Sequence, residues 1–382
     1  MRLTSAGQLR PNVKEPLDDT TADLISEICP GIHVRGPEAP ARGLLHPLWG
    51  PLVNLYRGWA SDPAVRHQAA AGGALTALAC HLLNTKAVEA VLHVRASAEH
   101  PLLTNASISR TAEEVLAASQ SRYGPVAPLT QVHSLLQAGT RFAVVGKPCD
   151  IAAIRNLQRK DDRADGQIPY LLTIFCGGVP SLHTARRIAA YLGIAEEEVS
   201  LFRWRGNGWP GPTRIETKDG RVFELSYDEV WYSKDVPWTY DIQFRCKICP
   251  DAIGELADVA CPDGWIMENG GPIHTEAPGV NVIIARTERG ADLIQSAAEA
   301  GAISLRPFTV DELDSMHADH IPRKIEHPAR LRALVQEGAP PPKFENFRDE
   351  DMIARAGPDC DRQAELKMRR RVRAGANREP LS

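Results

Sequence analysis

The sequence predicts an α/β fold with a mainly parallel sheet at its core and helices on its flanks. Two strand–turn–helix units carry this prediction. Residues 141–146 are an apolar run after Arg141 that leads through a proline turn into a helical pattern at 151–157. Residues 170–175 lead through a turn with glycines and a proline to a helix at 182–192. Such runs are typical of strands buried on both faces. Their alternation with helices indicates βα units.

The rest of the chain divides into three segments. Residues 1–50 are an irregular N-terminal lead-in segment, with one short helix expected at 21–28. Residues 51–306 form the main domain, and residues 307–382 form a polar C-terminal tail in which we expect a short helix. Within the main domain, the pattern also predicts a buried helix at 74–83, a hairpin at 213–225, a strand at 280–286 and a helix at 290–300.

Composition excludes several classes of function. The 382-residue chain has a formal net charge of -4, which gives no reason to expect nucleic acid as a partner. No run approaches the roughly 20 apolar residues that span a bilayer, and the N-terminus has no apolar segment of a secretory signal. We therefore expect a cytoplasmic protein. Its 8 cysteines are then more consistent with metal binding, catalysis or burial than with disulfides.

A C-x-x-C pair is the strongest chemical signal. Cys246 and Cys249 can hold one metal centre from a single turn, and a complete site needs about two more protein ligands. Cys149 and Cys176 are the best candidates, because each follows a predicted strand and ligands of parallel sheets collect beyond the strands' carboxyl ends. The pattern leaves three alternatives open, namely an iron–sulfur cluster, a zinc ion, and no metal, since cysteine is often simply buried.

Three other features carry weaker signals. Gly72-Gly73 before a helix is a candidate phosphate site, because glycines let backbone N–H groups approach an anion at a helix N-terminus; a plain tight turn is the alternative. Asp258 is a candidate acid, with a surface or capping carboxylate as the alternative. The Trp- and Gly-rich loop at 203–212 fits either a substrate wall or a packed loop.

Taken together, these motifs resemble the beta-subunit family of coenzyme F420 hydrogenases and dehydrogenases. That family also includes the 7-hydroxymethyl chlorophyll a reductases and the ferredoxin-dependent divinyl chlorophyllide reductases. The order and spacing of the motifs hold from about residue 50 to residue 305, and the resemblance is carried by residues 71–78, 145–155, 174–181, 202–206, 244–251, 254–258 and 284–290.

The resemblance implies a flavoprotein with a 4Fe-4S cluster beside the flavin. The flavin would be FAD, with FMN as the alternative. The family's acid falls on Asp258, and Lys147 is both a catalytic and a flavin-site candidate. The remaining positions that carry over are the cluster ligands Cys149, Cys176, Cys246 and Cys249, and the flavin-site residues Gly72, Gly73, Thr76, Arg122 and Tyr123.

Such a protein would convert one-electron transfer into two-electron reduction or oxidation of a small conjugated organic substrate or a deazaflavin. A ferredoxin or a partner subunit would exchange the electrons. Two alternatives are an electron-transfer subunit without its own substrate site and, less favoured, a structural zinc protein. Homo-oligomerisation is left open.

The sequence also departs from the family. Ala69 to Ala71 replace serines that many members have before the glycine pair, and only residues 28–31 resemble the end of an N-terminal ferredoxin-like region. Cys29 and Cys261 are left without an assigned ligand role.

Overall fold

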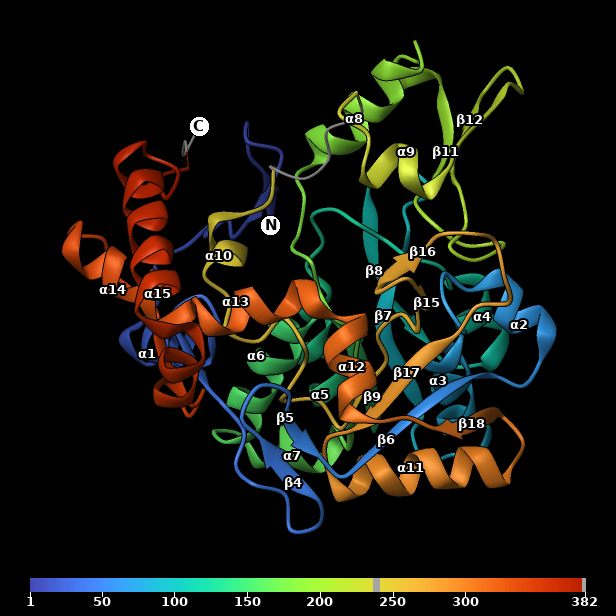
Figure 1. Ribbon diagram of the computed structural model, residues 1–382. Coiled ribbons are helices and arrows are strands. Elements are labelled where there is room, and N and C mark those ends of the chain that lie inside the picture. The colour runs from blue at the N-terminus through green and yellow to red at the C-terminus, as the bar shows by residue number, and fades with distance from the viewer. Residues whose placement is uncertain (236–240, 380–382) are drawn as a thin grey trace.

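A computed structural model describes residues 1–235 and 241–379. Its centre is an eight-stranded sheet (Figure 1). In spatial order the strands are β18 (Ile303–Pro307), β6 (Asn54–Ala60), β17 (Asn281–Ala285), β14 (Val259–Ala260), β10 (Tyr170–Thr173), β9 (Phe142–Gly146), β7 (Ala90–Ala96) and β8 (Thr104–Ser109).

The predicted α/β class is confirmed, and the sheet is mixed. Strands β7, β9, β10 and β14 run parallel, whereas β17 is antiparallel to both β14 and β6, and β18 and β8 are antiparallel strands at the two edges. All five residues of the antiparallel β17 are buried, as in the parallel strands. An apolar run therefore indicates burial on both faces without revealing strand direction.

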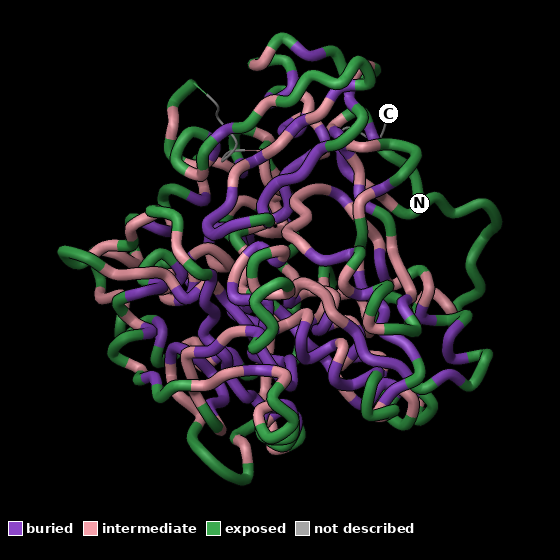
Figure 2. The backbone as a smooth tube through the Cα atoms, turned by 90° about the vertical axis from the view of Figure 1, so that its right-hand side faces the viewer, coloured by how far each residue is buried: buried purple, intermediate pink, exposed green. Residues whose placement is uncertain are grey.

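Helices cover both faces of the sheet. The helices α3 (Ala74–Asn84) and α11 (Glu288–Glu299) pack on one face, and α5 (Val132–Gln137), α6 (Pro148–Gln158) and α7 (Asp162–Gln167) pack on the other. In β9, Ala143 faces the first layer, and Phe142 and Val144 face the second, as the two-residue period of a strand requires. Figure 2 shows the buried segments concentrated between these layers.

A smaller unit with its own core lies at the top of Figure 1. It contains α8 (Leu182–Tyr191), α9 (Tyr227–Trp231) and a three-stranded antiparallel sheet of β11 (Val199–Arg203), β12 (Thr213–Thr217) and β13 (Val222–Leu225). The pairing of Ile215 with Phe223 confirms the predicted hairpin. The remaining short elements of the main domain are α2 (Pro63–Gln68), α4 (Ala112–Ala117), α10 (Phe244–Lys247), β15 (Ile266–Glu268) and β16 (Gly271–Ile273).

The C-terminal segment is more structured than the predicted tail. It forms α12 (Val310–Met316), α13 (Ile321–Ile325), α14 (His327–Gln336), β19 (Lys343–Glu345) and α15 (Asp349–Arg373), which is kinked at Gly357, where the backbone leaves the helical conformation. The prediction of a short helix was wrong. The apolar stripe of α15 is narrow, so the apolar pattern of the sequence does not reveal how far the helical segment extends. Met368 and Val372, spaced four residues apart, pack with Leu334 of α14 and with Ile248, so a thin stripe suffices to dock a mostly charged helix.

The N-terminal segment is joined to this C-terminal unit. It contains β1 (Arg2–Leu3), β2 (Leu9–Arg10), α1 (Asp19–Ile28), β3 (His33–Arg35), β4 (Leu44–His46) and β5 (Gly50–Leu52). Strand β3 pairs in parallel with β19, so the two ends of the chain share a small sheet. Among the described residues, every helix is too short or too polar to cross a membrane.

Candidate cofactor site

The carboxyl ends of the parallel strands bring most of the predicted site residues to one edge of the sheet. Lys147 follows β9, and Cys176 lies three residues beyond the end of β10. Strand β6 runs in the same direction, because it is antiparallel to β17, which is antiparallel to β14. Its last residue, Ala60, donates its N–H to the carbonyl of Gly72 at 2.7 Å. The cysteine segments and the glycine turn therefore share this edge.

Cys149 occupies the first turn of α6. Pro148 begins the helix, and the Asp150 carboxylate accepts the backbone N–H of Lys147 at 3.3 Å. Proline at the first helical position and a side-chain acceptor three residues after the N-cap are both common at helix N-termini. The partial positive charge of a helix N-terminus favours a thiolate at this position.

The two remaining cysteine segments are hydrogen-bonded to each other. The N–H of Cys176 donates to the carbonyl of Ala252 at 2.8 Å. The N–H of Val179 donates to the sulfur of Cys246 at 3.4 Å. The loop after β10 and the C-x-x-C loop are thus held side by side.

The four thiols form one electrostatic group. Burial raises the pKa of Cys149 well above its usual value, and Cys176 and Cys249 add to that increase. Burial, followed by Cys246, raises the pKa of Cys176 to about 12. Cys261 behaves differently, because burial alone raises its pKa and its side chain packs in the main core. The structure therefore brings together the four predicted ligands and leaves Cys261 outside the group.

Sulfur spacing distinguishes between kinds of metal centre. Four thiolates on one zinc ion lie about 3.8 Å apart, given a Zn–S bond of about 2.3 Å and tetrahedral geometry. Across residues 1–235 and 241–379, no three cysteine sulfurs lie within 4.8 Å of one another. The thiols are near enough to interact electrostatically. This arrangement fits a larger inorganic core held by four thiolates.

Lys147 places a fixed positive charge beside the thiols. Its Nζ lies 2.7 Å from both oxygens of Asp150. Burial opposes the charged form, but Asp150 and the neighbouring Cys149 outweigh it and raise the pKa of Lys147 above its usual value. The ammonium group stays charged and compensates for negative charge on the cysteine group.

The C-terminal helices cover the cysteine loops, which the sequence did not indicate. Arg323 of α13 donates to the carbonyls of Gly177 at 2.6 Å and Cys246 at 3.1 Å. Lys324 donates to the carbonyl of Pro250 at 3.1 Å. Figure 1 shows α13 passing beside α10. The only sequence signal was basic residues among apolar ones in a segment that otherwise looked like a polar tail.

The glycine turn is locked against β17. Gly73 has a φ of 73°, a conformation that favours glycine. A Cβ on Gly72 would lie 2.7 Å from the backbone N of Asn281, and the side chain of Asn281 accepts the N–H of Ala74 at 3.1 Å. Thr76, in the first turn of α3, is half-buried.

Arg205 connects the two segments of the predicted flavin site. Its Nη2 donates to the carbonyl of Ala70 at 2.7 Å, directly before the glycine turn, and to Asp263 at 2.8 Å. An antiparallel bridge joins Arg205 to Ser121, so the turn carrying Arg122 and Tyr123 lies alongside. The Nε of Arg122 is buried and has no hydrogen-bond partner in the described chain. A buried cation of this kind fits an anionic group of a bound cofactor.

Asp258 lies away from the cysteines. It is 2% exposed and accepts hydrogen bonds from Arg155 at 2.9 Å, the N–H of Leu171 at 2.8 Å and the hydroxyl of Thr287 at 2.7 Å. Leu171 lies near the start of β10, whereas Cys176 lies beyond its carboxyl end. Asp258 therefore lies at the amino ends of the parallel strands, where it holds Arg155, Leu171 and Thr287 together. Its catalytic role stays a prediction.

Aromatic residues divide into a packed set and a partly exposed set. Trp204 and Trp209 are 3% and 1% exposed, so the loop at 203–212 is packed. The rings of Tyr227, Tyr232 and Trp265 lie 4.7, 5.1 and 5.2 Å from the ring of His274. Trp238 and Tyr240, two further aromatic residues that precede the C-x-x-C pair in the sequence, lie outside the described residues.

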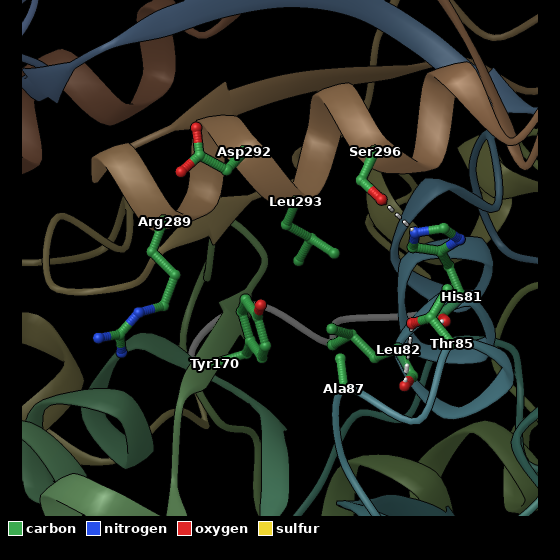
Figure 3. A pocket seen from close by; sticks show the side chains of 9 residues that line it. All are labelled: His81, Leu82, Thr85, Ala87, Tyr170, Arg289, Asp292, Leu293 and Ser296. Atoms are coloured by element: carbon green, nitrogen blue, oxygen red, sulfur yellow. Dashed lines mark hydrogen bonds between the residues drawn. The ribbon is translucent and has the colours of Figure 1, made fainter.

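A cavity of about 410 Å³ lies at the other edge of the sheet, between α3 and α11 (Figure 3). Tyr170, the first residue of β10, lines it together with Arg289 and Leu293. A hydrogen bond of 3.0 Å between His81 and Ser296 crosses one end. This cavity is remote from the cysteine group and forms no part of the candidate site.

Comparisons with known proteins now identify the family. Residues 55–133 match the family described as "Coenzyme F420 hydrogenase/dehydrogenase, beta subunit N-term", and residues 139–311 match its C-terminal counterpart. The chain belongs to this family. The predicted resemblance is confirmed, and all four grouped cysteines and the glycine turn lie inside the matched segments.

Individual relatives agree with this assignment. The chain is 26% identical over 253 residues to the F420-dependent formate dehydrogenase subunit beta of Methanocaldococcus jannaschii. The aligned region covers 65% of this chain and 60% of that protein. It is 25% identical over 262 residues to the coenzyme F420 hydrogenase subunit beta of Methanothermobacter thermautotrophicus, covering 65% of this chain and 82% of that protein. The match thus spans under two thirds of the length of the formate dehydrogenase subunit.

A solved structure supports the fold. A chain of the F420-reducing NiFe hydrogenase complex from Methanosarcina barkeri superposes with a TM-score of 0.60 at 18% identity, covering 78% of this chain and 98% of that one. At this identity the likeness establishes the fold.

Proposed function

We propose that this protein is an iron–sulfur flavoprotein oxidoreductase that works with a redox partner. A 4Fe-4S cluster on the four grouped cysteines would exchange single electrons with a ferredoxin or a partner subunit. A flavin, with FAD favoured over FMN, would transfer a hydride to or from a planar conjugated substrate such as a deazaflavin. The residues proposed to hold these groups are Cys149, Cys176, Cys246 and Cys249 for the cluster, and Gly72, Gly73, Thr76, Arg122, Tyr123 and Lys147 for the flavin.

One observation carries the proposal, which is that four thiols and a glycine turn meet at the carboxyl edge of one sheet. The four cysteines are half-buried, and Lys147 supplies a nearby positive charge. The partly exposed rings of Tyr227, Tyr232 and Trp265 offer flat faces on which a conjugated substrate can stack. Relatives whose names contain "F420-dependent" are consistent with a deazaflavin substrate.

A relay subunit without its own substrate site is the second candidate. It is favoured by the relatives' names, which describe subunits of formate dehydrogenases and hydrogenases.

The test uses full-length protein purified and reconstituted without oxygen. Chemically reduced protein is mixed with coenzyme F420 in the absence of any other subunit, and the loss of the F420 absorption band is followed. The enzyme proposal expects stoichiometric reduction of F420 by the reduced protein, whereas Cys246→Ser should lose the reduction of F420 that is driven by a one-electron donor such as reduced ferredoxin. A relay would instead reduce an electron-only acceptor such as ferricyanide and leave F420 unchanged. A colourless protein with one zinc per chain would contradict both proposals.

A further inference from the structure

Three potential metal ligands meet at the turn between α12 and α13. His317 follows the last residue of α12, and Asp319 and His320 belong to the one-turn helix η3 (Ala318–His320), which leads into α13. The two longer helices meet at an angle there (Figure 1). Each of the three side chains offers one nitrogen or oxygen atom, and these atoms all lie within 4.8 Å of one another. The turn therefore gathers two imidazoles and a carboxylate.

Both histidines have one ring nitrogen held by an oxygen acceptor. The Nε2 of His317 lies 3.0 Å from the carbonyl oxygen of Asp263, and the Nδ1 of His320 lies 3.1 Å from one carboxylate oxygen of Asp319. Because an oxygen acceptor fixes the proton on that nitrogen, the other nitrogen of the neutral ring presents a lone pair. Histidines that bind metals are oriented in this way by a carbonyl or a carboxylate.

The second ring nitrogen of His320 is buried without a partner. The side chain is 9% exposed, and its Nε2 has no hydrogen-bond partner in the described part of the chain. Burying a polar atom in this way costs free energy unless something else binds it. Across residues 1–235 and 241–379, Asp319 pairs with His320 and with no lysine or arginine. Its negative charge is therefore also available to a cation.

The spacing of the two imidazole rings fits one shared ion. The ring centroids of His317 and His320 lie 5.7 Å apart, at an interplanar angle of 80°. Zinc–nitrogen bonds of about 2.0–2.1 Å in tetrahedral geometry would place two such centroids about 5.2 Å apart, so a small side-chain rotation closes the difference. Imidazole and carboxylate suit zinc and other divalent transition metals, whereas magnesium and calcium prefer sites made of oxygen atoms.

We propose that His317, Asp319 and His320 bind a divalent transition-metal ion, with zinc as the favoured ion. Three protein ligands leave one position of a tetrahedral zinc ion open. Water fills this position, because the Asp319 side chain is 76% exposed and the site faces solvent on that side. None of the three residues belongs to the proposed cluster or flavin site, so the inference does not rest on the proposed function.

A metal ion at this turn would fix the segment that covers the cysteine group. The rings of His317 and His320 lie 4.9 and 5.2 Å from the ring of Phe175, which directly precedes Cys176. Arg323, three residues after His320, donates to backbone carbonyls of both cysteine loops. The ion would therefore hold the start of α13 in place beside those loops.

X-ray absorption at the zinc edge tests the site, because it reports the atoms bound to zinc without interference from iron. Full-length protein with its cluster in place is treated with EDTA, given one equivalent of zinc and desalted, all without oxygen. We expect one zinc per chain, with nitrogen and oxygen neighbours at about 2.0–2.1 Å and no sulfur at about 2.3 Å. Zinc that is lost on desalting, or zinc with sulfur neighbours, would overturn the proposal.

Three variants locate the site, with zinc affinity measured by competition with a chelator. His320→Ala should weaken zinc binding by at least about 100-fold, because loss of a supporting group alone costs about 10- to 100-fold. Asp319→Ala guards against a folding artefact, since its side chain is exposed, and it should weaken binding by at least about 10-fold. Asp311→Ala removes an exposed carboxylate of α12 and should leave the affinity unchanged. Unchanged affinity in His320→Ala or in Asp319→Ala would overturn the proposal.

Failure of the proposed function remains distinguishable. If the protein holds no iron, its cysteines can take the first equivalent of zinc, and a second equivalent is then measured in the same way. A second zinc with nitrogen and oxygen neighbours that is lost in His320→Ala supports the site by itself. Absence of such a zinc overturns it.

Discussion

Replacing Glu255 with glutamine should destabilise the protein strongly and loosen the cysteine loop. The Glu255 side chain is fully buried, and it pairs with both Lys324 of α13 and Arg348, whose side chains are 5% and 11% exposed. Lys324 also donates to the carbonyl of Pro250, next to Cys249. This carboxylate therefore holds the C-terminal helices onto the C-x-x-C loop.

The expected magnitude follows from the charges left behind. Removing one member of a buried ion pair costs about 3–5 kcal/mol, because the partner charge is left buried without compensation. Here two cations lose one shared anion, while glutamine keeps the volume and one acceptor oxygen. We therefore expect Glu255→Gln to lower the free energy of unfolding by about 3 kcal/mol. Iron retention after gel filtration should fall as well, since the loop loses its anchor.

Equilibrium urea unfolding measures the first effect, and iron analysis measures the second. Glu345→Gln is the matched control, because Glu345 pairs with two groups, His33 and Lys343, at a more exposed position. That control should destabilise the protein far less than Glu255→Gln, because exposed ion pairs contribute little. A Glu255→Gln variant within about 1 kcal/mol of wild type, with full iron content, would refute the reasoning.

Three further predictions concern the site and its supports. Asp258→Asn should lower the free energy of unfolding by roughly 2–4 kcal/mol in urea titrations, because its partner Arg155 loses a buried charge pair. If Asp258 only braces the sheet, the rate of F420 reduction by the folded fraction should stay near that of wild type, and a loss of rate without a loss of stability would instead indicate an acid. Lys147→Gln should shift the midpoint potential of the cluster downward by roughly tens of millivolts, because a nearby cation favours the more negative reduced state; Lys160→Gln, at an exposed site, should leave it unchanged. Hydrogen bonds from Arg373 and Arg369 lower the pKa of Glu337 to about 2, so the stabilisation that they give is present above pH 4.5 and is lost as the pH falls towards 2. The urea midpoints of wild type and Glu337→Gln should therefore differ above pH 4.5 and converge below it, and a constant difference over this range would count against the pairing of α14 with α15.

The cysteine group was predictable because it depends on sheet topology. Cys149 and Cys176 each follow a strand that reads as buried, and parallel strands bring their carboxyl ends to one edge. The position of the C-x-x-C loop beside them was a weaker inference, because it depends on contacts such as that between the N–H of Val179 and the sulfur of Cys246. Such contacts join distant parts of the chain and leave no local pattern.

The C-terminal cover and the different partners of Arg203 and Arg205 were not predictable. The segment that carries Arg323 looks polar, and its docking depends on Ile248 and on backbone carbonyls that any sequence possesses. Arg203 and Arg205 look equivalent in the sequence. Only the structure shows that Arg205 lies 2.8 Å from Asp263, some sixty residues later in the chain, whereas Arg203 lies 4.0 Å from Glu224.

The central claim is that four cysteines from three segments hold one iron–sulfur core. The most direct measurement is the iron and acid-labile sulfide content per chain of anaerobically prepared wild type and of each cysteine-to-serine variant. We expect about four iron atoms per chain in wild type, and loss of most of that iron, with the fold retained, in the variants at Cys149, Cys176, Cys246 and Cys249. Cys360→Ser, on the outlying helix α15, should keep full iron content. A wild type without iron, or iron that survives substitution of any of the four, would contradict the account.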